Sequence, residues 1–352
     1  MSTTNASTST STSTNTATAP RSSKPASASA SSPYSWRQAM PVPRLLQQLF
    51  DLVPLATYSA NTLPARSPST TPDQLPTLYV FASDEDARFG APSFNPSCLK
   101  WQTYLKLAGV RFHITPSTNH ASPSGALPFL LPARSSPTDS PAPIPSNKLQ
   151  HYAFAQGPAP PPELTSLRLE AYQALLDLPV RNAWLQSLYL EPAHAALLDE
   201  LYVAPASSSG WIRASLRAQL RRAAEAEILR TSSSATAAVV DVDAVYAAAL
   251  EAFEALAGLL AESETGWFFG AAQPTLFDAS VFAYTHLMLR YLGPGEENGS
   301  AQAAEAPFVP ARLGVVVGCA GAGELERHRE RMLKRVWGEP LVDADGVRRS
   351  IE

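Results

Sequence analysis

The chain has 352 residues with a formal net charge of -4 and 45% hydrophobic residues, enough apolar material for one large or two modest domains. This nearly neutral balance excludes a dedicated nucleic-acid binder, and the lack of an uninterrupted run of about 18 apolar residues predicts that no helix spans a membrane. The two cysteines, Cys98 and Cys319, cannot build a disulfide framework or a zinc cluster, so a reducing compartment is expected.

The first 40 residues are rich in serine and threonine and contain no acidic residue. Such a composition occurs in mitochondrial transit peptides, which is one interpretation of this segment. However, the stretch STTNASTSTSTSTNTATAP has no leucine or aromatic residue that could form an amphipathic face. We therefore predict a solvated, disordered tail over residues 1–40.

Residues 41–75 form an apolar leader with a different character. Its prolines bracket a dense apolar patch that predicts a short helix followed by extended chain. The patch consists of Leu45, Leu46, Leu49, Phe50, Leu52, Val53 and Leu55. Because so many large side chains are unfavourable in water, we expect the leader to dock on the helical domain, on a partner or on a membrane surface. Leu45, Leu49, Phe50 and Leu52 are the candidate docking residues.

Residues 76–157 predict the strand–helix–strand–strand order of a thioredoxin-like domain. TLYVFAS (77–83) predicts a short apolar strand, and two further strands are expected over 110–117 and 125–132. The helix between the first two strands should be capped by Asn95, with Pro96 at its first position and Gly109 after its last turn.

After a proline-rich linker, residues 162–340 predict an all-helical domain. In the segment 241–262, Asp241 precedes apolar residues that recur every three or four positions, which is typical of an amphipathic core helix. The helix over 273–292 should begin with a variant of the capping box, Thr275-x-x-Asp278.

A small α/β half with Leu-Pro before its third strand, followed by an all-helical half, resembles the glutathione-transferase fold. Four segments more specifically resemble the fungal metaxin-like proteins: LLQQLFDLVPLATYSANTLPARS, LYVFASDEDARFGAPSFNPSCLKWQTYLKLAG, NHASPSGALPFLLP and GWFFGAAQPTLFDASVFAY. This family includes the cytosol-facing peripheral subunit of the mitochondrial outer-membrane sorting and assembly machinery. The resemblance covers about residues 41 to 338.

The resemblance implies a non-catalytic subunit at the cytosolic face of the mitochondrial outer membrane. Its partners would be the β-barrel core subunit, a second metaxin-like subunit and β-barrel precursors, which it would help to recognise, insert or release. Precursor strands carry unpaired hydrogen-bonding edges that strand addition or apolar grooves can capture. Two alternatives remain open: the other metaxin-like subunit of the same machinery, and a glutathione-dependent transferase.

Cys98 lies in the first turn of the helix that follows Asn95. Free backbone N–H groups and the helix dipole favour a thiolate there, so one interpretation is a nucleophile or a glutathione-activating thiol. Ser93 and Ser97 could instead offer an activating hydroxyl. The other interpretation is an inert residue buried beneath the sheet, because free cysteines are mostly buried. We favour the buried role, since no C-x-x-C motif is present.

The resemblance also places a glutathione pocket on this sequence. Pro128 matches the family's cis-proline, beside which Leu127 would present its backbone to a bound peptide. The acidic and serine pair that holds the γ-glutamyl end should fall near Pro145-Ser146, where the acidic partner is missing. We therefore expect Ser97, Cys98, Leu127, Pro128 and Ser146 to form the remnant of a pocket, with no catalytic residue and no cofactor.

Other patterns are weaker. The histidines are scattered without metal-ligand spacing, so no metal site is expected. Arg213, Arg217 and Arg221 share one face of a predicted helix. We name them as candidates for docking on anionic lipid or an acidic partner, but of the two interpretations we favour a plain solvated face.

Overall fold

The computed structural model describes residues 75–133, 141–231, 239–292 and 323–338. The tail and the apolar leader lie outside these ranges except for residue 75, so the docking residues Leu45, Leu49, Phe50 and Leu52 are not described.

Four short strands form one mixed sheet in the order β2-β1-β3-β4. β1 pairs with β2 in parallel and with β3 antiparallel, and β3 pairs antiparallel with β4. The predicted thioredoxin-like order is confirmed, but all three expected strands are shorter than expected, and Gly125, with a positive φ, lies in a turn at the start of the third expected segment. The strands are β1 (Thr77–Val80), β2 (His113–Pro116), β3 (Phe129–Leu131) and β4 (Ile144–Pro145).

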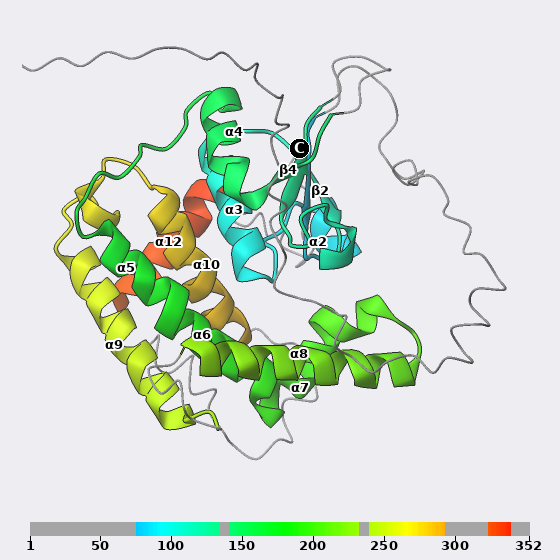
Figure 1. Ribbon diagram of the computed structural model, residues 1–352. Helices are drawn as coiled ribbons and strands as arrows, with labels where there is room; N and C mark the ends of the chain where they lie inside the picture. Colours follow the sequence, from blue (N-terminus) through cyan, green and yellow to red (C-terminus); the bar gives the residue numbers. More distant parts are fainter. Residues whose placement is uncertain (1–74, 134–140, 232–238, 293–322, 339–352) are drawn as a thin grey trace, which may run out of the picture. The chain divides into compact units, whose positions relative to one another are not determined.

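The helix α3 (Pro96–Leu107) covers one face of this sheet together with α4 (Leu149–Gln156) (Figure 1). Asn95 caps α3 as predicted, and the apolar side chains of Cys98, Trp101, Tyr104 and Leu105 on this helix are buried. A short helix, α2 (Asp84–Arg88), follows β1 and is an element that the sequence analysis did not predict. The peptide bond between Leu127 and Pro128 is cis, as the resemblance implied.

The rest of the described chain is helical. From Leu169 to Leu190, α-helical and π-helical turns follow one another without a break, and Pro179 lies inside the first π-helical stretch. The elements are α5 (Leu169–Leu175), η4 (Leu176–Val180), α6 (Arg181–Leu185), η5 (Gln186–Leu190), α7 (Ala195–Leu198), η7 (Asp199–Val203), α8 (Gly210–Thr231), α9 (Val242–Ala261), α10 (Leu276–Tyr291) and α12 (Glu324–Trp337).

The helix α9 is the predicted amphipathic core helix. Asp241 caps it, and its periodic apolar side chains, among them Tyr246, Phe253 and Leu260, are buried. Contrary to the sequence expectation, α9 has the length and apolar composition of a membrane span. Its few acidic residues interrupt the apolar run, but the mean hydropathy of the helix stays high enough for a span. Half of the helix is buried against protein, and core helices commonly pass this test, so the finding is weak evidence for a membrane.

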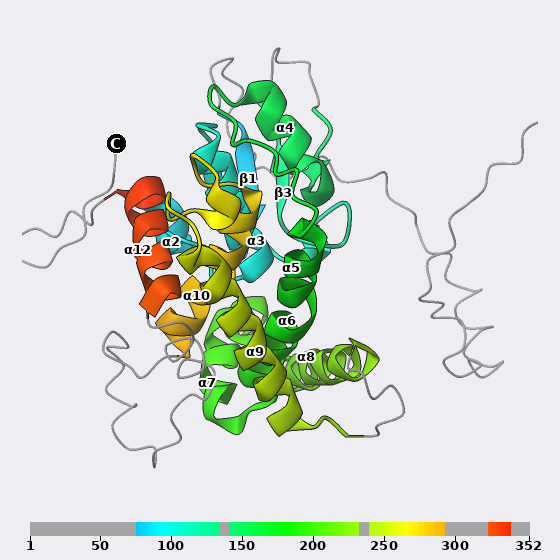
Figure 2. The ribbon, with the colours of Figure 1, turned by 90° about the vertical axis from the view of Figure 1, so that its left-hand side faces the viewer.

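The helix α10 joins the two halves, because it makes its most extensive contact with α3 of the thioredoxin-like domain. The C-terminal helix α12 packs beside α10 and contacts α3 as well (Figure 2). At its end, the Trp337 indole N–H donates a hydrogen bond of 3.0 Å to the carbonyl oxygen of Gly90, just after α2.

Asp278 connects these helices through a fully buried carboxylate. Its Oδ2 accepts the N–H of Thr275 at 2.9 Å and the Thr275 hydroxyl at 2.7 Å, which completes the predicted capping box. Its Oδ1 accepts the N–H of Phe268 at 3.1 Å and lies 3.1 Å from Nε2 of His328. Because an ionised carboxylate only accepts, the His328 Nε2 must be the donor.

We predict that Asp278→Ala lowers the free energy of unfolding by about 3–5 kcal/mol, because it leaves several buried donors without an acceptor. Urea denaturation measures the loss. The matched control is Glu251→Ala at an exposed acidic position of α9, where the change should stay within about 0.5 kcal/mol. Equal stability of the two variants would contradict a central role for Asp278.

A second prediction concerns His286, which is 3% exposed and whose Nδ1 accepts a hydrogen bond of 3.2 Å from Nε of Arg329. Burial, helped by the charges of Arg329 and Arg290, lowers the pKa of His286 to about 3. Its pKa in the unfolded chain is about 6.5. The stability contributed by neutral His286 is therefore complete above about pH 6.5 and is lost as the pH falls towards 3.

We expect unfolding free energies at pH 7 and pH 4.5 to differ less in His286→Leu than in the unchanged chain, because the variant has no imidazole to protonate. The imidazole contributes at most about 1.4 kcal/mol per pH unit. His113→Leu, at an exposed position of β2, should keep the original pH dependence. The same slope in all three proteins would show that His286 titrates normally.

Candidate functional site

The N-terminal end of α3 is the place where the expected pocket remnant should lie. Asn95 is the side chain that satisfies this helix end: its Oδ1 accepts the N–H groups of Ser97 at 3.1 Å and Cys98 at 3.2 Å. Free N–H groups at a helix start can stabilise an anion, but here these two are already bonded. Ser97 itself is exposed.

Cys98 is completely buried in the core between α3 and the sheet. Burial raises the pKa of its thiol to about 12, and the opposing hydrogen bonds to the Phe81 backbone and the Ser93 side chain only reduce that rise. The Ser93 hydroxyl is also committed, because it donates a hydrogen bond of 2.5 Å to the carbonyl oxygen of Phe81. A neutral, enclosed thiol is a poor nucleophile.

The remaining pocket residues follow the same pattern. The N–H of Leu127, which would face a bound peptide, already donates to Oδ1 of Asn119 at 3.0 Å. Ser146 is half-buried and begins the turn after β4, and Pro145 beside it has no N–H to offer. The fold therefore brings the expected residues to the sheet edge and the α3 start, yet hydrogen bonds within the protein occupy the backbone donors described.

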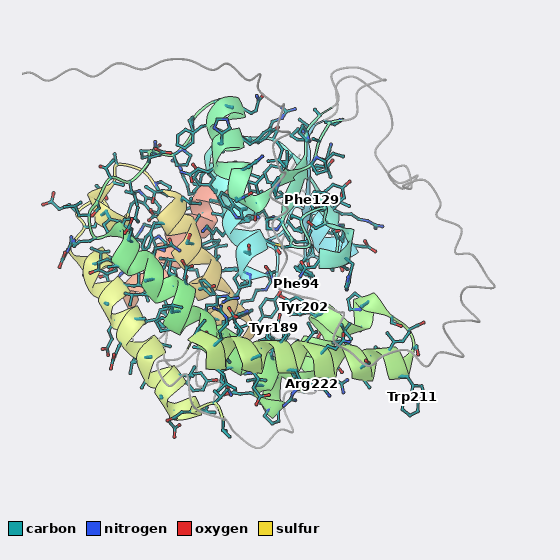
Figure 3. The ribbon with its side chains drawn as sticks, in the orientation of Figure 1. Phe94, Phe129, Tyr189, Tyr202, Trp211 and Arg222 are labelled. Carbon is teal, nitrogen blue, oxygen red and sulfur yellow. The ribbon has the colours of Figure 1, made fainter. Side chains whose placement is uncertain are left out.

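An aromatic cluster lies next to the N-terminal end of α3. It consists of Phe81, Phe94, Tyr189 and Tyr202. The Tyr202 ring meets Phe81 and Phe94 edge-on, with ring centroids 5.2 Å apart in both pairs, and its centroid is 5.9 Å from that of Tyr189. The Tyr202 hydroxyl accepts a hydrogen bond of 3.2 Å from Nδ2 of Asn95. Figure 3 shows Phe94, Tyr202 and Tyr189 together, between the sheet domain and the helices below it.

The two phenols of this cluster are neutral. Burial raises the pKa of Tyr189 to about 12. Burial also raises the pKa of Tyr202 well above its ordinary value, and the neighbouring Tyr189 and Cys98 add to this rise. Neither phenol is poised to activate a thiol. Sequence analysis missed the cluster because Tyr202 comes from η7, more than a hundred residues along the chain from Phe81 and Phe94.

The three arginines of α8 that were named as docking candidates are half-buried, and each contacts another part of the chain. Arg217 forms a two-pronged ion pair with Asp199 of η7, Nε lying 2.6 Å from Oδ1. Nη2 of Arg221 donates to the Leu190 carbonyl at 3.2 Å, and Nη2 of Arg213 donates to a carbonyl just before α8. The physical reason is that η5 and η7 pack along α8 and present acceptors to this face.

The start of α8 exposes large apolar side chains. Trp211 is 89% exposed and Ile212 is also exposed. Figure 3 shows Trp211 projecting from the start of α8, and Arg222 lies farther along the helix. Among the described residues, no group of histidine, cysteine and acidic side chains could hold a metal ion.

We predict that Cys98 resists thiol reagents in a Cys319→Ser background, because at pH 8 only about one thiol in 10⁴ is ionised when the pKa is about 12. Tyr202→Ala should speed labelling by Ellman's reagent by about tenfold or more, since it removes two edge-on contacts worth about 0.5–1.5 kcal/mol each. Tyr172→Ala, which removes the edge-on contact with Phe269, is the control and should label slowly. Rapid labelling of Cys98 without any variant would show an open pocket.

Sequence profiles of two domain families match the chain. The profile of the glutathione S-transferase N-terminal domain matches residues 96–194. That of the glutathione S-transferase C-terminal domain matches residues 249–297. The first match begins at Pro96, where α3 begins, and the second spans most of α9 and all of α10. A search of curated proteins gave no match.

Solved structures with a similar arrangement are also glutathione-related. A glutathione transferase family member from Pseudomonas fluorescens with two glutathione bound is 12% identical in sequence, with a TM-score of 0.43. The match covers 77% of this chain and 94% of the Pseudomonas chain. A glutathione S-transferase of Ceriporiopsis subvermispora in complex with glutathione is 17% identical, with a TM-score of 0.44, covering 74% and 98%. The glutathione transferase GSTFuA3 from Phanerochaete chrysosporium is 13% identical, with a TM-score of 0.44, covering 74% and 97%.

The two family matches fall on the two halves that the structure shows, a mixed sheet with a cis bond before Pro128 and a helical second half. The chain therefore has a glutathione-transferase-like fold, with a thioredoxin-like N-terminal domain and a helical C-terminal domain.

Proposed function

We propose that this chain is a non-catalytic subunit of the mitochondrial outer-membrane sorting and assembly machinery. It would be bound peripherally at the cytosolic face and help to recognise, insert or release β-barrel precursors. The support for this identity is the resemblance of four sequence segments to the fungal metaxin-like proteins. Three of them fall largely on the described fold, at β1 to α3, at the cis-proline strand and at the start of α10.

The single structural observation that supports a non-catalytic role is the closed end of α3. Cys98 is buried and neutral, the first amides of the helix are bonded to Asn95, and the Leu127 N–H is bonded to Asn119. An enzyme that activates glutathione needs an accessible nucleophile or base and free donors for the peptide. A subunit that only binds other proteins needs neither.

Glutathione-dependent transfer is the second candidate function, because both matching domain profiles describe glutathione S-transferase domains. It requires that the pocket open in solution. Retention on glutathione resin, together with turnover of common electrophilic substrates, would distinguish it. Turnover that disappears in Cys98→Ser or Ser97→Ala would favour the enzyme over the machinery subunit.

Cell fractionation and copurification test the proposed identity. The chain should be found with the mitochondrial outer membrane, copurify with a β-barrel core subunit and a second metaxin-like subunit, and be released by carbonate as a peripheral protein. The identity of the accompanying metaxin-like subunit separates the two possible places in the machinery. Recovery in the cytosol without these partners would contradict the proposal.

For the leader, we predict that Leu49→Asp combined with Phe50→Asp weakens copurification with the machinery. Each large apolar side chain contributes about 1.5–3 kcal/mol when fully buried, and a buried unpaired carboxylate is costly. Deletion of residues 1–38, which removes most of the polar tail, is the matched control and should leave assembly intact. If the double variant copurifies at an unchanged yield and melts at an unchanged temperature, the leader has no docking role.

A further inference from the structure

A second hollow in the protein lies away from the closed end of α3. It is a cavity of about 550 Å³ lined by α3, α4, the linker before α5, α5 itself and the start of α10. Tyr104 and Phe277 belong to its lining and are buried, and Leu169 contributes a half-buried apolar wall. Cavities that hold ligands typically measure about 300–1,000 Å³ and are mostly apolar. Tyr104 lies about two helical turns beyond Asn95, so this cavity is separate from the pocket remnant.

The rim of this cavity carries three exposed carboxylates, Glu163, Glu170 and Asp177. Glu170 and Asp177 are seven residues apart, so they lie on the same face of the continuous helix formed by α5 and η4. Glu163 comes from the linker between α4 and α5 and accepts a hydrogen bond from Gln150 of α4. The cavity is therefore apolar inside and acidic at its edge.

The partners of these carboxylates are neutral. Nε2 of Gln150 donates to Glu163 at 3.3 Å, and Nε2 of Gln173 donates to both oxygens of Asp177 at 3.1 and 3.2 Å. Within the described ranges, none of the three carboxylates has a cationic side chain at ion-pair distance.

The negative charge of the rim affects Lys100. Burial lowers the pKa of Lys100, and the charge of Asp177 partly opposes that change. The Lys100 ammonium lies 5.4 Å from the centroid of the Trp101 ring. Lys100 forms no ion pair with any of the three carboxylates within the described ranges, so the rim keeps its acidic character.

Two exposed leucines belong to the cavity lining or lie close to it in sequence. Leu178, next to Asp177, lines the cavity and is 43% exposed. Leu167, two residues before α5, is fully exposed. A ligand that matches this site must place a positive charge at the rim and apolar groups both inside and beside the cavity.

We infer that this cavity binds a polypeptide segment in which an arginine or lysine lies between large apolar side chains. The charge complements the acidic rim, the apolar side chains match the interior and the exposed leucines, and a chain can cover both at once. The cavity would bind such a segment whether or not the chain serves the machinery proposed above.

The probe is a fluorescein-labelled peptide, acetyl-Phe-Leu-Arg-Leu-Phe-amide, titrated with the full chain and followed by fluorescence anisotropy. Its matched control replaces the arginine by citrulline, which has nearly the same shape without the charge. We expect the arginine peptide to bind several-fold more tightly than the citrulline peptide. Raising NaCl from about 50 to about 500 mM should weaken the arginine peptide selectively, because exposed charges are screened.

Two variants locate the binding. Glu170→Gln combined with Asp177→Asn should weaken the arginine peptide by roughly two- to fivefold for each charge removed and leave the citrulline peptide unchanged. Ala174→Trp, at an exposed position of the cavity lining, should block both peptides by filling the space. Glu251→Gln, at the exposed acidic position of α9, is the control and should bind like the unchanged chain.

The same titrations can overturn the inference. Equal affinity for the arginine and citrulline peptides, or no binding of either at millimolar concentration, would show that the acidic rim selects no cationic segment. Undiminished binding by Ala174→Trp, with circular dichroism showing a folded protein, would place the peptide elsewhere on the surface.

Discussion

The buried carboxylate of Asp278 is the constraint on which the rest of this structure depends. It fixes the start of α10 through Thr275, the preceding loop through Phe268 and α12 through His328. A buried charge is tolerated only when its acceptor sites are filled, and here the protein itself supplies the donors. Any movement of these elements apart would leave that charge and its donors unpaired.

The position of α10 in turn fixes α3, because the two helices form the main contact between the domains. The helix α3 then serves two regions of different character. Its first turn, around Cys98, is closed by Asn95 and the aromatic cluster, whereas the side chain of Tyr104 belongs to an open cavity with an acidic rim. One helix therefore separates a buried, neutral thiol from a cavity with an acidic rim.

Suppression of the thiol has a simple physical origin. A cysteine at a helix start becomes reactive when water and free amides can stabilise its thiolate. Here the Asn95 side chain accepts the amide hydrogens at the start of α3. Phe81, Phe94 and Tyr202 pack together near this helix end, and the Cys98 sulfur is completely buried. Desolvation then outweighs the two hydrogen bonds that favour the thiolate, so the pKa rises instead of falling.

The sequence by itself determined the elements whose signals are local. The caps at Asn95, Asp241 and Thr275 and the core face of α9 depend on residues within a few positions of one another. Only the tertiary structure decided which partners the side chains of the sites have and which of them remain exposed. It brought Tyr202 onto Phe81, turned Arg217 towards Asp199, and set Glu163 beside the helix that carries Asp177. These contacts join residues that are distant in the chain or lie on different elements, and whether a side chain meets a partner or water depends on how those elements pack, which no local pattern encodes.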